Sequence, residues 1–122
     1  MTTRLTIAVL GLAAFAASPA FADAESGEKV FKKCQTCHEV KAEKNKVGPH
    51  LVGIVGRQAG SVEGFKYSDA MKGSGITWTE ENLAKYLKDP KGFIPGNKMA
   101  FVGLKKDEEV ADVIAYLKQP SS

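Results

Sequence analysis

Apolar residues recur at helical spacing in several short segments of the chain, separated by long stretches without periodicity. Val110, Val113 and Leu117 form one such stripe near the carboxyl end. Thr79 and Asp107 stand where a side chain commonly caps the first turn of a helix. The pattern predicts helices at residues 27–34, 67–72 and 80–88, and a last helix that Asp107 caps and that runs to about residue 119.

Glycine and proline dominate the segments between these helices, which we therefore expect to be loops. Gly73 should end the second helix and Asp89-Pro90 the third, while residues 39–64 and 91–106 should lack regular structure. No alternating strand pattern of useful length is present. The predicted fold class is all-α, and loops this long in a compact domain need a bound group around which they can pack.

The most continuous apolar run, residues 5–17, lies at the amino terminus. It follows one positive charge at Arg4 and precedes Ala-Phe-Ala at residues 20–22, which is the pattern of a cleaved secretory signal. A retained membrane anchor is the alternative, but the run is shorter than the roughly 20 residues that span a bilayer. We expect residues 1–22 to be a signal peptide and residues 23–122 to form one domain in the periplasm.

Charge excludes one class of function and leaves others open. Cleavage would remove only Arg4 from 17 basic residues, leaving 16 against 14 acidic ones and a net charge of +2. This balance is too mild for a nucleic-acid-binding domain. No second long apolar segment follows the leader, so we expect a soluble monomer without stable membrane insertion.

The pentapeptide Cys34-Gln35-Thr36-Cys37-His38 has the C-x-x-C-H spacing of c-type haem attachment. Two thiols at this spacing, at the end of a helix, can form thioethers to both vinyl groups on one edge of a porphyrin. The next residue then brings its imidazole to the iron. We predict one haem c per chain, covalently bound through Cys34 and Cys37, with His38 as an iron ligand.

Two other interpretations of this pentapeptide compete with haem attachment. A thiol–disulfide redox pair should follow a strand, whereas here a helix is predicted before it. Zinc could use Cys34, Cys37, His38 and His50, but Cys37 and His38 are adjacent and no pair of histidines has finger spacing.

Whether protein fills the sixth iron position separates an electron carrier from a haem enzyme or gas sensor. Met1 leaves with the signal, and Met71 lies in a short helix where a core role is expected. Met99 follows the turn Pro95-Gly96 on a loop, which can hold a sulfur where a helix would not. Met99 is therefore the candidate, although a gap-filling core side chain is the alternative for it.

Short stretches distributed over most of the chain match one family in density and order. They are residues 48–49, 53–57, 64–67, 75–78, 86–87, 94–99 and 114–118. Through them, residues 27–119 resemble the small soluble class I cytochromes c, both mitochondrial and bacterial periplasmic. The resemblance implies the small cytochrome c fold, with several helices and long loops wrapped around one haem.

The resemblance also implies roles that spacing alone does not show. It makes Met99 the sixth ligand, has the Pro49 carbonyl orient His38, and places Tyr86 near the Met99 sulfur. It implies a haem-propionate environment made of Arg57, Tyr67 and Trp78. It also implies a crossing of the terminal helices at which Gly27 lies against Tyr116.

Three positions depart from the mitochondrial pattern. Met71 stands where those members carry Asn, and Asn97, beside Met99, stands where they carry Thr. We count Asn97 in the haem environment, but these two changes leave its hydrogen bonds open. His50 follows Pro49 where Asn is common, and we expect it to be a surface or structural histidine.

The function implied is that of an electron carrier and not of an enzyme. One electron would pass through an exposed haem edge by outer-sphere transfer, between ferric and ferrous states. Expected partners are acidic faces of redox proteins such as a cytochrome bc1-type complex, terminal oxidase, reductase or photosynthetic reaction centre. The surface expected to meet them is a ring of lysines: Lys32, Lys33, Lys46, Lys91, Lys98, Lys105 and Lys106.

Overall fold

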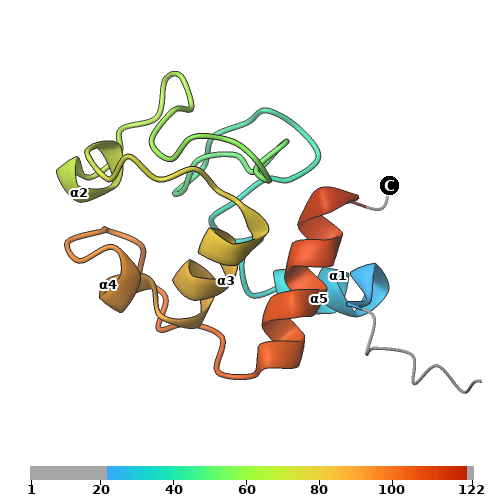
Figure 1. Cartoon of the computed structure of the whole chain (residues 1–122). Helices are drawn as coiled ribbons and strands as arrows, with labels where there is room; N and C mark the ends of the chain where they lie inside the picture. Colours follow the sequence, from blue (N-terminus) through green and yellow to red (C-terminus); the bar gives the residue numbers. More distant parts are fainter. Residues whose placement is uncertain (1–21, 121–122) are drawn as a thin grey trace, which may run out of the picture.

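The computed structural model describes residues 22–120, and every regular element in that range is a helix (Figure 1). In chain order these are α1 (Ala24–Phe31), α2 (Asp69–Lys72), α3 (Glu80–Lys88), α4 (Pro90–Phe93) and α5 (Asp107–Lys118). The β-type pairing within these residues is one isolated bridge between Gln58 and Thr77. The all-α prediction is confirmed. Except for Ala22, the predicted signal peptide lies outside the described residues.

Side-chain caps set the starts of the first three helices. The hydroxyls of Thr79 and Ser68 each accept a hydrogen bond from the backbone N–H three residues on, at 3.1 Å in both cases. Asp23 accepts one from the N–H of Glu25 at 3.0 Å. Each cap satisfies an amide that has no partner inside its helix. The predicted cap at Thr79 and the predicted end of α2 at Gly73 are confirmed.

Two predictions about helix ends and one about a loop are wrong. Helix α1 begins at Ala24 because Asp23 caps it, and it gives way to tight turns after Phe31. Asp107 is the first residue of α5 and not its cap, and its carboxylate instead pairs with Lys88 at 2.6 Å. Asp89-Pro90 ends α3 as predicted, but residues 91–93, which were predicted to be loop, continue from Pro90 as the one-turn helix α4. Proline is tolerated at a first helical position because the N–H it lacks would have no partner there.

Helix α1 packs across α5 and brings the two ends of the described chain together (Figure 1). A Cβ atom on Gly27 would lie 1.9 Å from the carbonyl oxygen of Asp112 and 2.8 Å from the Cβ of Tyr116. The rings of Phe31 and Tyr116 also meet here, with centroids 5.4 Å apart. The crossing of Gly27 and Tyr116 implied by the family resemblance is confirmed, because only glycine allows so close an approach.

Gly27→Ala is expected to lower the free energy of unfolding by about 1–3 kcal/mol, since the added methyl group meets a backbone carbonyl that cannot rotate away. Chemical denaturation of the intact protein measures the change. Lys29→Ala, on an exposed position of the same helix, is the control and should change this free energy by less than about 0.5 kcal/mol. Equal effects of the two substitutions would contradict the packing argument.

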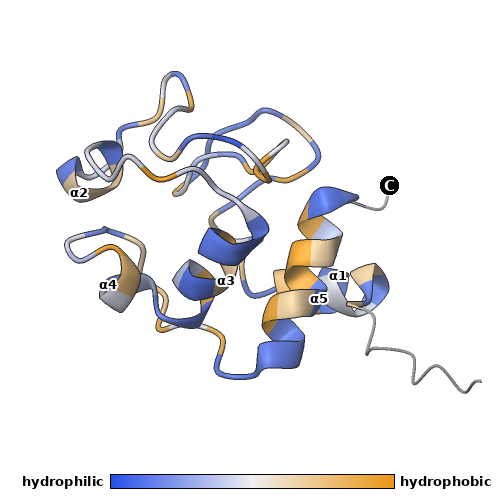
Figure 2. Ribbon diagram, viewed as in Figure 1, coloured by the Kyte–Doolittle hydropathy of each residue, from blue (hydrophilic) through white to orange (hydrophobic). Residues whose placement is uncertain are grey.

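The buried apolar residues of the described chain form one connected core, to which two groups of residues contribute. The middle turns of α5 are apolar and its ends polar (Figure 2), and Val113 in the middle is only 1% exposed. The second group lies along the loops between α1 and α3, where Ile54, Ala59 and Trp78 are buried without any helix of their own. The irregular structure predicted for residues 39–64 is confirmed, and these loops form one side of a cavity.

Candidate functional site

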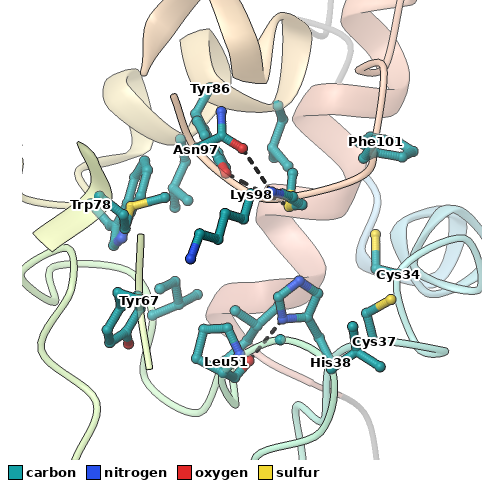
Figure 3. Close-up of a pocket in the computed structure, with 18 of the residues that line it drawn as sticks. Cys34, Cys37, His38, Leu51, Tyr67, Trp78, Tyr86, Asn97, Lys98 and Phe101 are labelled. Atoms are coloured by element: carbon teal, nitrogen blue, oxygen red, sulfur yellow. Dashed lines mark hydrogen bonds between the residues drawn. The ribbon is translucent and has the colours of Figure 1, made fainter. Parts of the chain in front are cut away.

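A cavity of about 350 Å³ lies between the segment that follows α1, the loops around α2 and the loop that follows α4 (Figure 3). Its lining is mainly apolar, with Leu51, Ile54, Leu83 and Phe101 among the residues that form it. Polar side chains enter it at a few separate places. Such a cavity suits a large, flat, mostly apolar ligand that is fixed at a few polar points.

Cys34, Cys37 and His38 stand together along one part of this cavity (Figure 3). The turns after α1 arrange them, because the carbonyl of Cys34 accepts hydrogen bonds from the N–H groups of Cys37 at 3.0 Å and His38 at 2.9 Å. Both cysteines are free thiols and half-buried. Burial raises the pKa of Cys34, and the neighbouring Cys37 adds to the shift. The pentapeptide is thus folded so that its three reactive side chains face one space.

The ring of His38 is held in one orientation. Its Nδ1 lies 2.7 Å from the carbonyl oxygen of Pro49, and a carbonyl can only accept, so Nδ1 carries the proton. The lone pair of Nε2 is then available as a metal ligand. Burial lowers the pKa of His38, which favours this neutral form.

The backbone of Gly48 lies close against the imidazole ring of His38. A Cβ atom there would lie 2.3 Å from Cε1 of His38. This contact was not predicted from the sequence, where residues 48–49 stand out only as one of the stretches that match the family. The signal for it was a small residue directly before the Pro49 carbonyl that holds the ring.

Met99 lies on the other side of the cavity, near Tyr86. Figure 3 shows Tyr86 and Asn97 across the cavity from His38, and the Tyr86 hydroxyl donates to the Met99 sulfur at 3.7 Å. Burial raises the pKa of Tyr86 to about 12, so the hydroxyl keeps its proton at neutral pH. The proximity of Tyr86 to the Met99 sulfur, implied by the resemblance, is therefore present in the structure.

Arg57, Tyr67 and Trp78 all line the cavity. The guanidinium of Arg57 donates to the carbonyls of Val52 at 3.2 Å and His50 at 2.9 Å, but its Nε is buried without a hydrogen-bond partner among residues 22–120. An unpaired buried donor is costly, and a cation in that position suits an anionic group of a ligand.

The zinc interpretation fails on geometry. Within the part of the chain that the structure describes, no three side chains of His, Cys, Asp or Glu come close enough to hold a metal ion. His50 has a structural role. Its backbone N–H donates to Oδ1 of Asn45 at 3.1 Å, and its ring Nδ1 accepts from the backbone N–H of Val52 at 3.3 Å. The expected structural role of His50 is confirmed. Met71 packs against the core but also lines the cavity.

Comparisons with known proteins agree with this geometry. The family model described as cytochrome c matches residues 24–121. The chain belongs to the cytochrome c family. Cytochrome c2 of Blastochloris viridis is 54% identical over 117 residues, which cover 95% of this chain and 92% of that protein. Cytochrome c-550 of Nitrobacter winogradskyi is 53% identical over 98 residues, covering 80% and 90%.

A solved structure extends the comparison to the fold. Cytochrome cH from Methylobacterium extorquens superposes with a TM-score of 0.75 at 48% identity, covering 79% of this chain and 97% of that one. The small cytochrome c fold and the class I resemblance are thereby confirmed. No helix among residues 22–120 is long and apolar enough to cross a membrane.

Membership of the family establishes the cofactor as covalently attached haem c and the function as one-electron transfer. The residues present fit that group. The two thiols and the imidazole share one wall, the apolar cavity suits a porphyrin, and the unpaired Nε of Arg57 suits a carboxylate at its edge. This chain is therefore an electron carrier.

Proposed function

We propose that Cys34 and Cys37 hold the haem through thioether bonds and that His38 and Met99 are its axial iron ligands. The observation that carries this proposal is the single cavity, with the two thiols and the imidazole on one side and the Met99 sulfur beside Tyr86 on the other. Bound there, the haem supplies a ferric/ferrous couple for outer-sphere transfer of one electron.

The surrounding residues tune and hold the ligands. Pro49 fixes the ring of His38 through its carbonyl, which makes the imidazole a better donor. Tyr86 donates to the sulfur of Met99 and limits its movement. Arg57, Tyr67 and Trp78 line the cavity and would supply hydrogen-bond donors to the haem carboxylates, since unpaired buried charges would cost several kcal/mol.

Residues 1–22 are proposed to be a signal peptide, so that residues 23–122 work in the periplasm. There the protein would shuttle electrons between membrane-bound redox complexes, such as a cytochrome bc1-type complex and a terminal oxidase, reductase or photosynthetic reaction centre. Net charge is small, so docking on their acidic faces depends on where the lysines lie.

Ion pairing within the domain leaves most of the seven predicted docking lysines without an acidic partner. The four ion pairs found among residues 22–120 engage Lys33, Lys85, Lys88 and Lys118, and only Lys33 belongs to the predicted ring. Lys33 and Lys98 line the cavity itself. Three of these four pairs use lysines outside the ring, so the charges of most ring lysines stay available to a partner, which supports a positive surface beside the haem.

Two further ring lysines contact the segments that border the cavity. The Lys46 ammonium donates to the carbonyl of Gln35, inside the attachment pentapeptide, at 2.7 Å. The Lys105 ammonium donates to the carbonyl of Val102 at 3.1 Å, one residue beyond the cavity residue Phe101. Both are good probes of the proposed docking surface because neither forms an ion pair within the described chain.

The rate constant for electron transfer to an acidic redox partner is expected to fall as salt rises, because exposed charges are screened over about 8 Å at physiological ionic strength. Lys46→Glu and Lys105→Glu should each lower the low-salt rate roughly threefold to tenfold and flatten its salt dependence. Stopped-flow mixing with the partner over a salt series measures both.

Lys85→Glu makes the same change of charge on α3, where Lys85 pairs with Glu81 at 3.2 Å and does not line the cavity. It serves as the matched control and should leave the rate close to that of the wild type. A wild-type rate independent of salt, or equal losses in all three variants, would show that docking does not use this lysine surface.

A further inference from the structure

Asn97 uses its whole side chain to hold the loop that carries Met99. Its Nδ2 donates to the carbonyls of Pro90 and Ile94, both at 2.8 Å, and its Oδ1 accepts from the N–H of Met99 at 2.9 Å. The three bonds join both ends of α4 to the backbone of Met99. They occupy both amide protons and the carbonyl oxygen of the side chain, so Asn97 has little capacity left for another group.

The loop has few other ties. Among residues 95–103, the one backbone N–H that bonds to a backbone carbonyl is that of Asn97, which donates to Ile94 at 3.2 Å. Regular pairing resumes only at Leu104, which donates to Leu87 at 2.7 Å. Pro95, Gly96, Lys98, Ala100 and Val102 are exposed. A segment with so few internal bonds and so much exposure opens readily unless a side chain holds it.

We propose that Asn97 is a positioning residue that holds the Met99 sulfur at the iron by clamping the backbone of this loop, without itself bonding to the haem. The proposal rests on the proposed role of Met99 as axial ligand. Tyr86 holds the sulfur from the side-chain end, whereas Asn97 holds the main chain, so the two contacts are separate.

The chemistry of the clamp requires an amide. A threonine hydroxyl has one proton and can donate to only one of the two carbonyls. Leucine, similar in size to asparagine, can donate to neither. Losing the clamp removes up to three hydrogen bonds. The carbonyls of Pro90 and Ile94 each keep a backbone N–H as partner, whereas the N–H of Met99 loses its partner. The open form of the loop should therefore be populated about tenfold to a hundredfold more in Asn97→Leu, and by a smaller factor in Asn97→Thr.

The test measures how fast cyanide binds to the ferric haem-loaded protein, because cyanide must wait for the sulfur to leave the iron. We expect Asn97→Leu to bind cyanide about ten to a hundred times faster than the wild type, with Asn97→Thr between them. Both should weaken the sulfur–iron charge-transfer band. If the leucine variant fails to fold, the threonine variant still decides the question.

Asn82→Leu is the matched control. Asn82 also donates through Nδ2 to a backbone carbonyl, that of Thr77 at 2.8 Å, but it lies in α3 and not in the Met99 loop. This variant should lose stability while keeping the wild-type cyanide rate. Equal rates of cyanide binding in the Asn82 and Asn97 variants would overturn the proposal that Asn97 clamps the loop.

Met99→Ala separates the two ideas. If it binds cyanide much faster than the wild type while the Asn97 variants do not, the ligand assignment stands and the clamp alone is wrong. If Met99→Ala leaves the cyanide rate and the band unchanged, Met99 is not the ligand, and the clamp proposal is overturned together with that assignment.

Discussion

Replacing both Cys34 and Cys37 with alanine is expected to abolish stable haem-loaded protein and leave a largely unfolded chain. The physical reason is that one side of the domain consists of loops around an apolar cavity, and loops this long need a bound group around which they can pack. Without covalent attachment, the group that fills this space is free to leave. A pyridine haemochrome spectrum measures attachment, and far-UV circular dichroism measures the remaining helix.

Thr36→Ala is the control for this experiment, because Thr36 is exposed within the same pentapeptide and does not line the main cavity. It should retain one attached haem and the wild-type helix content. Full native helicity in haem-free material would show that the helices form a stable core unaided, and the argument from the cavity would then be wrong.

Met99→Ala is expected to open the iron to carbon monoxide or cyanide and to lower the reduction potential by on the order of 100 mV. Thioether sulfur favours ferrous over ferric iron, and for a one-electron couple 59 mV corresponds to a tenfold change in that preference. Spectroscopic titration with carbon monoxide and potentiometry of the haem-loaded protein measure the two effects.

Met71→Leu provides the matched control, since Met71 lines the same cavity and also packs against the core. It should keep the sulfur–iron charge-transfer band and exclude carbon monoxide as the wild type does. Loss of the band in Met71→Leu would reverse the assignment of the ligand. Rapid binding of carbon monoxide by the wild type would instead favour a gas-binding or enzymatic haem protein.

Several parts of the fold were predictable because they depend on local chemistry. The Thr79 hydroxyl caps α3 through an amide three residues away, and Gly73 ends α2. The stripe of Val110, Val113 and Leu117 became the buried face of α5. In each case, the residues that decide the structure lie within a few positions of one another.

Predictions failed where distant residues competed for the same group. Asp107 looked like a helix cap, but Lys88 lies near enough to take its carboxylate. Helix α4 was missed because Pro90 was interpreted only as a terminator of α3, although it also opens the next turn with Asp89 as its cap. Neither alternative can be judged from neighbours in the sequence alone.

The sequence by itself determined the chemistry of the site. The covalent chain fixes the spacing of Cys34, Cys37 and His38 whatever fold the other residues adopt. The Pro-Gly turn before Met99 indicated the second candidate ligand. Only the tertiary structure decided how these groups are held. The close approach of Gly48 to the His38 ring and the bonds from Asn97 to Pro90 and Ile94 depend on positions that folding sets to within a few tenths of an ångström. Hydrogen bonds and close packing form only when atoms are placed with this precision. The order of residues along a chain does not specify such positions.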